Sequence, residues 1–303
     1  MSLTHSFDVV VIGAGPAGEN AAVTAAYFGK SVAVVERAPV LGGAAVNTGT
    51  VPSKTLRETA LALSGLRTRE LHGVDLSLRR SATVEDFLRH ERAVKATERE
   101  QTRRLLERYG VRVFHGTGRF ADPHTVAVAG PDGEAARLRG DAVVVAIGSA
   151  PVRPPGIPFE HPRVHDSDEL VDIYRLPASL AVVGAGVIGS EYACMFAALG
   201  VPTTLIDGRD VLLPFLDPDV SAALKAAMEQ LGVRFVWNER VAACDAPAEG
   251  DAPIRLLLSG GRAVEADQVL VCAGRVSRTA DLDPAAAGLQ VAEKGRLAVN
   301  AHY

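Results

Sequence analysis

Two hydrophobic patterns alternate along this chain. Short Val-rich runs, such as VVVI at 9–12 and VAVVE at 32–36, are typical of strands buried in a parallel sheet. Ala-rich stretches such as 16–28 follow them, with apolar residues at helical spacing. Strands that alternate with helices in this way predict an α/β fold built on parallel sheets.

The middle of the chain adds a long helix and several short strands. Residues 84–109 lack Gly and Pro and mix apolar positions with charges of both signs, which predicts one amphipathic helix with a solvated face. The alternating stretches 111–116, 124–130 and 136–141 predict short strands joined by Asp-Pro and Pro-Asp-Gly turns. The proline-rich segment 151–158 is expected to connect two domains.

An internal repeat organises the chain. FDVVVIGAGPAGENAA at 7–22 returns as LAVVGAGVIGSEYA at 180–193, and each copy places GxGxxG between a strand and a helix. An acidic residue ends the next strand in both copies: Glu36 follows Gly13 by 23 positions, and Asp207 follows Gly184 by 23. The second copy continues with apolar runs up to residue 275, and RLAVN at 296–300 predicts one further strand.

The repeated motif has a chemical purpose. Its glycines allow a tight turn and let a pyrophosphate approach the helix N-terminus, while the acid accepts hydrogen bonds from the ribose. Two such sites in one chain indicate one dinucleotide that stays bound and one that exchanges, as in hydride transfer through a bound flavin. A duplicated domain that has lost one ligand is the structural alternative.

Composition narrows the partners. The net charge is −4 and the pI is near 6.1, so no overall positive field favours nucleic acid or an anionic membrane. Three scattered cysteines and dispersed histidines predict neither a disulfide framework nor a metal site. Together with the absence of a signal-peptide pattern, the cysteine usage predicts a cytoplasmic protein. The charge favours small-molecule partners, and the two repeated motifs indicate that these are nucleotides.

The segment VLGGAAVNTGTVPSKTL at 40–56 resembles the flavin-contact segment of the FAD-dependent pyridine nucleotide-disulfide oxidoreductases, where GGxCxxxxC precedes PSK. In this registration the two redox cysteines fall on Ala45 and Thr50, and neither is a thiol. A dithiol mechanism needs a thiolate, so disulfide reductase, dihydrolipoamide dehydrogenase and mercuric reductase activities are not expected.

Within that family the chain resembles the soluble transhydrogenases, which share threonine at the second cysteine position but usually keep the first thiol. The matching stretches include GTVPSKTLR, HPRVHDSDEL and RDVLLPFLD. The resemblance implies FAD-dependent hydride transfer between NADPH or NADH and the other oxidised nucleotide. An NAD(P)H oxidase or diaphorase, and a truncated non-catalytic nucleotide-binding module, are the alternatives.

The resemblance also implies roles for individual residues. It places Lys54 near flavin N5, where its ammonium would stabilise the reduced anionic flavin. Tyr192 would either cover the flavin or pack in the core. Asp207 favours NAD(H), whereas Arg209 leaves NADP(H) open. The residues implied at the FAD site, besides Lys54, are Gly13, Gly15, Gly18, Glu36, Gly43, Thr50, Gly118 and Gly148. Those implied at the NAD(P) site are Gly184, Gly186, Ile188, Gly189, Glu191, Asp207, Arg209 and Gly274.

The expected architecture is two Rossmann-like dinucleotide-binding domains, the second inserted into the first. Residues 1–152 are assigned to FAD, residues 153–274 to NAD(P), and residues 275–303 to a segment returning to the FAD domain. The family resemblance implies a further C-terminal dimerisation domain that this sequence does not contain. We therefore expect weak FAD retention by the 303-residue chain, and association with a second copy or with a chain that carries the missing domain.

Overall fold

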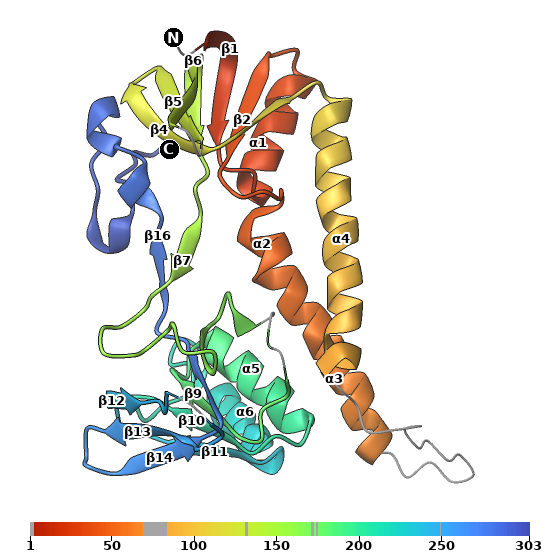
Figure 1. The fold of residues 1–303 in the computed structure, drawn as a ribbon, viewed down its shortest axis with the longest axis vertical. Helices are drawn as coiled ribbons and strands as arrows, with labels where there is room; N and C mark the ends of the chain where they lie inside the picture. The colour runs from red at the N-terminus through yellow and green to blue at the C-terminus, as the bar shows by residue number, and fades with distance from the viewer. Residues whose placement is uncertain (1–2, 69–83, 131–132, 171–172, 174, 249) are drawn as a thin grey trace. The chain divides into compact units, whose positions relative to one another are not determined.

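The computed structural model describes residues 3–68, 84–130, 133–170, 173, 175–248 and 250–303. The chain forms two compact units (Figure 1). Unit 1 comprises Met1–Val51, Ala93–Ala150 and Arg275–Tyr303, and unit 2 comprises Pro52–Arg92 and Pro151–Gly274. The sequence of unit 2 is therefore inserted into that of unit 1.

Unit 1 is built on a six-stranded sheet of order β3-β2-β1-β6-β5-β4. Four of its strands, β3, β2, β1 and β6, are parallel, and β5 pairs antiparallel with both β6 and β4. The strands are β1 (Leu3–Ile12), β2 (Val32–Glu36), β3 (Arg112–His115), β4 (Thr117–Asp122), β5 (Thr125–Gly130) and β6 (Gly133–Val145). Since β1 pairs in register with both β2 and β6, the end of β1 lies at the centre of the parallel part of the sheet.

Helices cover one face of this sheet. Val11 and Val34 pack there against Ala22 of α1 and Leu106 of α4. The helices that begin in or pass through unit 1 are α1 (Pro16–Tyr27), α2 (Gly43–Asn47), α3 (Thr50–Thr68) and α4 (Val84–Arg108). The range of α4 confirms the long helix predicted over residues 84–109.

The C-terminal segment packs against the other face of the unit 1 sheet. Leu282 is buried with Ile12 and Phe120, and its carbonyl oxygen accepts a hydrogen bond from the N–H of Phe120. This segment contains β16 (Arg275–Ser277), which pairs with β7 (Ser149–Pro151), and the short 3-10 helices η2 (Thr279–Asp281), η3 (Pro284–Ala287) and η4 (Glu293–Gly295). The strand predicted over 296–300 is wrong: that stretch makes a single antiparallel bridge, between Leu297 and Val291.

Unit 2 contains a five-stranded parallel sheet of order β11-β10-β9-β15-β8 and a three-stranded antiparallel sheet of order β12-β13-β14. The parallel strands are β8 (Val164–Asp166), β9 (Leu180–Val183), β10 (Thr203–Ile206), β11 (Val233–Val236) and β15 (Gln268–Val271). The antiparallel strands are β12 (Val241–Asp245), β13 (Ile254–Leu258) and β14 (Ala263–Ala266).

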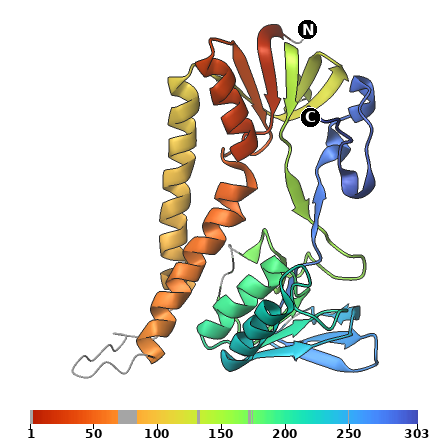
Figure 2. The same ribbon diagram turned by 180° about the vertical axis from the view of Figure 1, so that it is seen from behind.

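The parallel sheet of unit 2 is covered on both faces. On one face α5 (Val187–Ala198) and α6 (Pro218–Gln230) pack over it, with Phe196, Leu205 and Met228 in their core (Figure 2). On the other face Val269 packs against Leu256 of the three-stranded sheet. Both faces of the strands are apolar for this reason, which accounts for the continuous apolar runs in the sequence. Among the described residues, no helix is long and apolar enough to cross a membrane.

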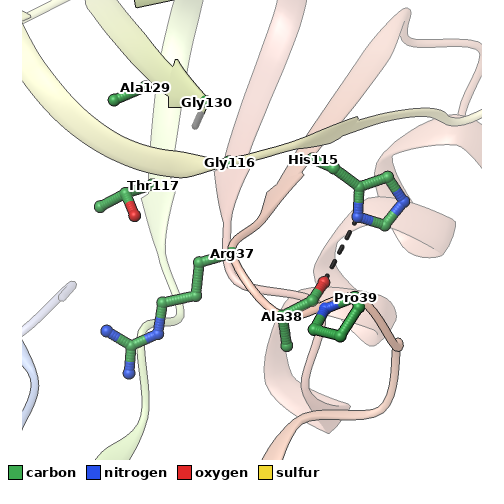
Figure 3. A pocket seen from close by; sticks show the side chains of 8 residues that line it. All are labelled: Arg37, Ala38, Pro39, His115, Gly116, Thr117, Ala129 and Gly130. Atoms are coloured by element: carbon green, nitrogen blue, oxygen red, sulfur yellow. Dashed lines mark hydrogen bonds between the residues drawn. The ribbon is translucent and has the colours of Figure 1, made fainter. Parts of the chain in front are cut away.

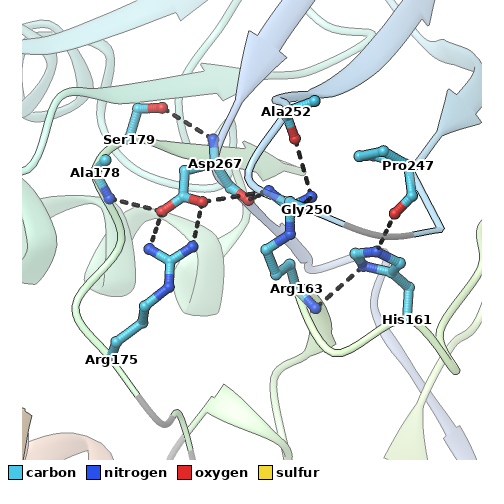
Figure 4. Close-up of polar contacts among 9 residues, drawn as sticks. All are labelled: His161, Arg163, Arg175, Ala178, Ser179, Pro247, Gly250, Ala252 and Asp267. Atoms are coloured by element: carbon cyan, nitrogen blue, oxygen red, sulfur yellow. Dashed lines mark hydrogen bonds and ion pairs between the residues drawn. The ribbon is translucent and has the colours of Figure 1, made fainter.

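An ionic network fastens the turn between β14 and β15 (Figure 4). The Asp267 carboxylate accepts two hydrogen bonds from the Arg175 guanidinium and one, at 2.8 Å, from the N–H of Ala178. Arg163 is buried and donates to the Asp267 carboxylate and backbone oxygen and, at 2.9 Å, to the carbonyl oxygen of Ala252. The network ties segments far apart in the chain of unit 2 to one turn.

Candidate functional site

The first glycine turn lies in unit 1, between β1 and α1. Gly13 has a φ of +106°, and a Cβ there would lie 2.3 Å from the carbonyl oxygen of Ala146. A Cβ on Gly18 would lie 1.8 Å from the carbonyl oxygen of Gly13, so only glycine lets the helix pack against the turn. Gly15 is the N-cap of α1 and places no side chain over the first N–H groups of the helix. The N-terminus of a 12-residue helix is thus open to an anion.

A second backbone segment approaches this turn. Gly43 begins α2, and a Cβ there would lie 2.7 Å from the Cα of Gly15, so the two glycine backbones are in contact. Thr50 is the exposed first residue of α3. Of these predicted residues, the structure brings Gly43 directly against the first glycine turn.

The Glu36 carboxylate is fixed at the end of β2 by the backbone. It is buried and accepts hydrogen bonds of 2.8 Å from the N–H groups of Ala14 and Ala38. A carboxylate has about four lone-pair positions, so two remain for the hydroxyl groups of a ribose. Glu36 is therefore oriented as the motif requires.

An open pocket of about 620 Å³ adjoins the end of β2 (Figure 3). The family resemblance implied Gly118, one residue beyond the Thr117 edge of the pocket, but it did not indicate Arg37 or His115. His115 Nδ1 lies 3.3 Å from the Ala38 carbonyl oxygen. The lining residues are Arg37, Ala38, Pro39, His115, Gly116, Thr117, Ala129 and Gly130. No motif marks Arg37 or His115, since only the parallel pairing of β2 with β3 places them together.

Two predicted glycines, Gly118 and Gly148, are not among the residues that line this pocket. Gly118 is buried on β4, where a Cβ would meet the side chains of Ile12, Val35 and Val126 at 3.1–3.4 Å. Gly148 has a φ of +67° in the turn before β7. In the structure Gly118 thus serves close packing of the sheet and Gly148 serves a backbone turn.

The second glycine turn, in unit 2, repeats the geometry of the first. Gly184 has a φ of +107°, and a Cβ there would lie 2.4 Å from the Cys272 carbonyl oxygen. A Cβ on Gly189 would lie 1.9 Å from the Gly184 carbonyl oxygen. Gly186 is the N-cap of α5 and makes no side-chain cap. In the part of the chain that the structure describes, no heavy atom lies within 4 Å of its Cβ position. The structure therefore provides a second anion-accepting helix end.

Two other predicted residues occupy different places around this turn. Ile188 is partly buried and packs against the helix-side core of unit 2. Gly274 has a φ of +100° and accepts a hydrogen bond from the N–H of Val152. Both residues lie in unit 2. Neither has a polar side chain, so each can contact a ligand only through its backbone or through apolar atoms.

The Asp207 carboxylate differs from that of Glu36 in that it forms an ion pair with an arginine, Arg209. It accepts hydrogen bonds from the Ala185 N–H at 2.7 Å, from the Arg209 N–H at 2.9 Å, and from Arg209 Nε and Nη2 at 2.8 Å each. Burial alone would raise the pKa of Asp207, but the hydrogen bonds from Arg209 and Ala185 outweigh it and hold the pKa at about 2. The predicted acid and arginine thus form one clamped pair.

Lys54 and Glu191, both predicted, meet within unit 2. The Lys54 ammonium lies 2.5 Å from Glu191 Oε1, and both side chains are partly exposed. The sequence singled out each residue without pairing them, because they are 137 positions apart. The ion pair fixes the position of the Lys54 ammonium on α3.

Two roles were considered for Tyr192, covering the flavin or packing in the core. Its side chain is 3% exposed and packs in the helix-side core of unit 2. Among the described residues, no cluster of His, Cys, Asp and Glu could hold a metal ion.

The residues present fit two dinucleotides. Each turn offers a pyrophosphate a helix N-terminus without a side-chain cap. Each also has glycines at positions where a Cβ would clash with the backbone of the turn. Each also orients a carboxylate through a backbone N–H of the same turn, Ala14 in unit 1 and Ala185 in unit 2. The open pocket beside Glu36 has room for the adenosine part of such a ligand.

Comparisons with known proteins agree with this geometry. The chain is 44% identical over 303 residues to a soluble pyridine nucleotide transhydrogenase of Mycobacterium bovis (strain BCG / Pasteur 1173P2) and 37% identical to one of Colwellia psychrerythraea. The alignments cover 99% and 100% of this chain and 64% of each relative, so the chain spans about two thirds of their length.

Solved structures show the same fold. The flavoprotein disulfide reductase RclA from Escherichia coli, as its Cu(II) complex, matches with a TM-score of 0.85 and 27% identity, covering 97% of this chain and 62% of RclA. LpdA from Mycobacterium tuberculosis matches with a TM-score of 0.86 and 28% identity, covering 98% and 64%. The family model for pyridine nucleotide-disulphide oxidoreductases matches residues 7–303. This chain therefore belongs to the pyridine nucleotide-disulphide oxidoreductase family.

Proposed function

We propose that the protein transfers hydride between NADPH or NADH and the other oxidised pyridine nucleotide, with FAD as its bound cofactor. When bound, FAD supplies an acceptor and a donor of hydride between two nicotinamides. The observation that carries the proposal is the pairing of two dinucleotide-type glycine turns with a flavin-contact segment that contains no thiol.

The missing thiols separate this proposal from disulfide reduction. Ala45 lies in α2 and Thr50 begins α3, at the two positions that the family resemblance assigns to redox cysteines. The three cysteines of the chain, Cys194, Cys244 and Cys272, all lie in unit 2. Hydride transfer between nucleotides requires no sulfur, so the proposed reaction is compatible with these replacements.

The residues of the two units would have separate binding roles. In unit 1, Gly13, Gly15, Gly18 and Gly43 would admit the FAD pyrophosphate, and Glu36 would accept hydrogen bonds from its ribose. In unit 2, the N-terminus of α5 and Asp207 would do the same for the nicotinamide dinucleotide. Lys54, held by Glu191, would supply a positive charge that stabilises a developing negative charge.

The transhydrogenase assignment is tested by supplying competing acceptors. FAD-loaded protein is reduced anaerobically with one equivalent of NADPH and mixed in a stopped-flow instrument with thio-NAD⁺ or with oxygen. We expect thio-NADH to form faster than oxygen is consumed. Reoxidation by oxygen alone would establish an NAD(P)H oxidase, and no flavin band after loading would favour a non-catalytic module.

A matched pair of lysine variants tests the role of the charge. K54M should slow thio-NADH formation by about 100–1,000-fold, the cost of losing one preorganised electrostatic group. K30M removes a lysine whose exposed ion pair with Asp8 lies in unit 1, and should leave the rate unchanged. Equal rates in wild type and K54M would remove Lys54 from the reaction.

Self-association and a cytoplasmic location are further parts of the proposal. Large apolar side chains such as Phe28 and Phe215 are about 70% exposed, which favours contact with another chain. The three cysteines are free thiols, as is typical of a reducing compartment. Sedimentation of the purified protein at several concentrations measures the first of these properties.

A further inference from the structure

Arg240 lies beside the segment that begins with Asp207, the acidic residue that directly follows β10. It follows Glu239, whose N–H donates to the Asp207 carbonyl oxygen at 3.1 Å, while the N–H of Asn238 donates to the Arg209 carbonyl oxygen at 3.1 Å. These two bonds fix the segment 238–240 alongside 207–209. The Arg240 side chain lies over Gly208: a Cβ on that glycine would be 3.0 Å from Arg240 Nε and 3.6 Å from its Cζ.

The repeat of the fold shows which position Arg240 occupies. In unit 1 the N–H of Gly116 donates to the Glu36 carbonyl oxygen, and the next residue, Thr117, lines the open pocket. In unit 2 the corresponding donor to the acid is Glu239, and the next residue is Arg240.

A second position of the repeat differs in the same way. In each unit the residue two positions after the acid donates its backbone N–H to the carboxylate of that acid. The donor is Ala38 for Glu36 in unit 1 and Arg209 for Asp207 in unit 2. Two neutral residues beside the first acid are thus replaced by two arginines beside the second.

The charges around Arg240 leave its guanidinium available. Within the described part of the chain, no carboxylate pairs with it, because the neighbouring Glu239 turns toward the N–H of Gly260 and the Ser259 hydroxyl. Arg209 is neutralised by Asp207. The group of Asp207, Arg209 and Arg240 therefore carries one net positive charge on an exposed rim.

We propose that Arg240 determines nucleotide specificity by binding, together with Arg209, the 2′-phosphate of NADP(H). A phosphate group can accept from both guanidinium groups, and arginine is suited to phosphate through its fork of N–H donors. When Arg209 turns from Asp207 to the phosphate, Arg240 offsets the repulsion between the phosphate and the Asp207 carboxylate, which has then lost its ion pair. With NAD(H), which lacks the phosphate, Arg209 stays with Asp207, so one site accepts both nucleotides.

This inference rests on the proposed function, and two probes separate their failures. The 303-residue chain, saturated with FAD, is titrated calorimetrically with 2′,5′-ADP and with 5′-AMP, which differ only in the phosphate. R240Q should bind 2′,5′-ADP about tenfold more weakly, as expected for the loss of a charge-assisted hydrogen bond, and 5′-AMP within about twofold of wild type. R255Q removes an exposed arginine from β13 of the same unit and should change neither affinity more than about twofold.

The outcomes are distinct. The proposal is supported if R240Q loses affinity for 2′,5′-ADP but not for 5′-AMP, and R255Q loses affinity for neither. Unchanged 2′,5′-ADP binding, or an equal loss for both probes, overturns it while leaving the hydride-transfer function intact. Failure of the wild-type chain to bind either probe overturns both. Because Arg240 is exposed, R240Q should fold normally, which its unfolding midpoint in urea will verify.

Discussion

Gly186 and Gly189 stand three residues apart in one turn and are required for different physical reasons. A Cβ on Gly189 would overlap the carbonyl oxygen of Gly184, so this glycine serves the packing of α5 against β9. A Cβ on Gly186 would meet no heavy atom of the described residues within 4 Å, so its lack of a side chain serves no packing contact there. The motif in the sequence identifies both residues, but only the structure separates their roles.

This difference predicts opposite behaviour in two alanine variants. G189A should lower the free energy of unfolding by about 1–3 kcal/mol, because the helix must shift to relieve the overlap. G186A should unfold like wild type but bind ADP-ribose at least about tenfold more weakly, because its methyl group lies where the pyrophosphate approaches. Urea denaturation and calorimetry measure the two effects. Destabilisation by G186A would contradict the open space found at its Cβ position.

At the scale of elements, alternation of strands and helices was sufficient to predict the parallel strands of both units, and the amphipathic pattern was sufficient to predict the long helix α4. The strand predicted over RLAVN fails for a local reason. The turn before it has positive φ angles at Lys294 and Gly295, and the Thr279 hydroxyl donates to the Gly295 carbonyl oxygen. This curled backbone leaves one bridge where a ladder was expected. A β-type composition does not show such tertiary constraints.

The turn between β14 and β15 depends on Asp267, which gives an element-scale prediction. In D267A the Arg163 guanidinium, 4% exposed, would keep its carbonyl partners but lose its carboxylate. An uncompensated buried charge costs about 3–5 kcal/mol, so unit 2 should unfold at a much lower urea concentration. K225A breaks the exposed Lys225–Glu229 pair and should cost less than about 1 kcal/mol. Similar midpoints for the two variants would show that Arg163 needs no carboxylate.

Over the whole molecule, the side-chain contacts that position Lys54 and that fasten the turn at Asp267 join residues far apart in sequence. Lys54 meets Glu191 across 137 positions, and Arg163 meets Asp267 across 104. Motifs identified Lys54, Glu191 and the two glycine turns because the repeat and the family resemblance mark them. Arg37, His115 and Arg240 belong to no motif, and their relevance depends on strand pairing that one sequence does not reveal.

The last prediction concerns all the thiols of the chain. Burial raises the pKa of Cys272 to about 12, with the Asp166 charge adding to the effect, and burial also raises the pKa of Cys194 and Cys244. Since the thiolate is the reactive form, these groups should react with iodoacetamide at pH 7.5 at least about tenfold more slowly than free glutathione.

If hydride transfer uses no sulfur, formation of thio-NADH from NADPH and thio-NAD⁺ should survive this treatment unchanged. Unfolding in urea should make all three thiols react, as the control for reagent activity. Loss of hydride transfer in proportion to the labelling of one cysteine would instead indicate that a thiol takes part. That result would contradict the proposal that Ala45 and Thr50 leave the reaction without a redox thiol.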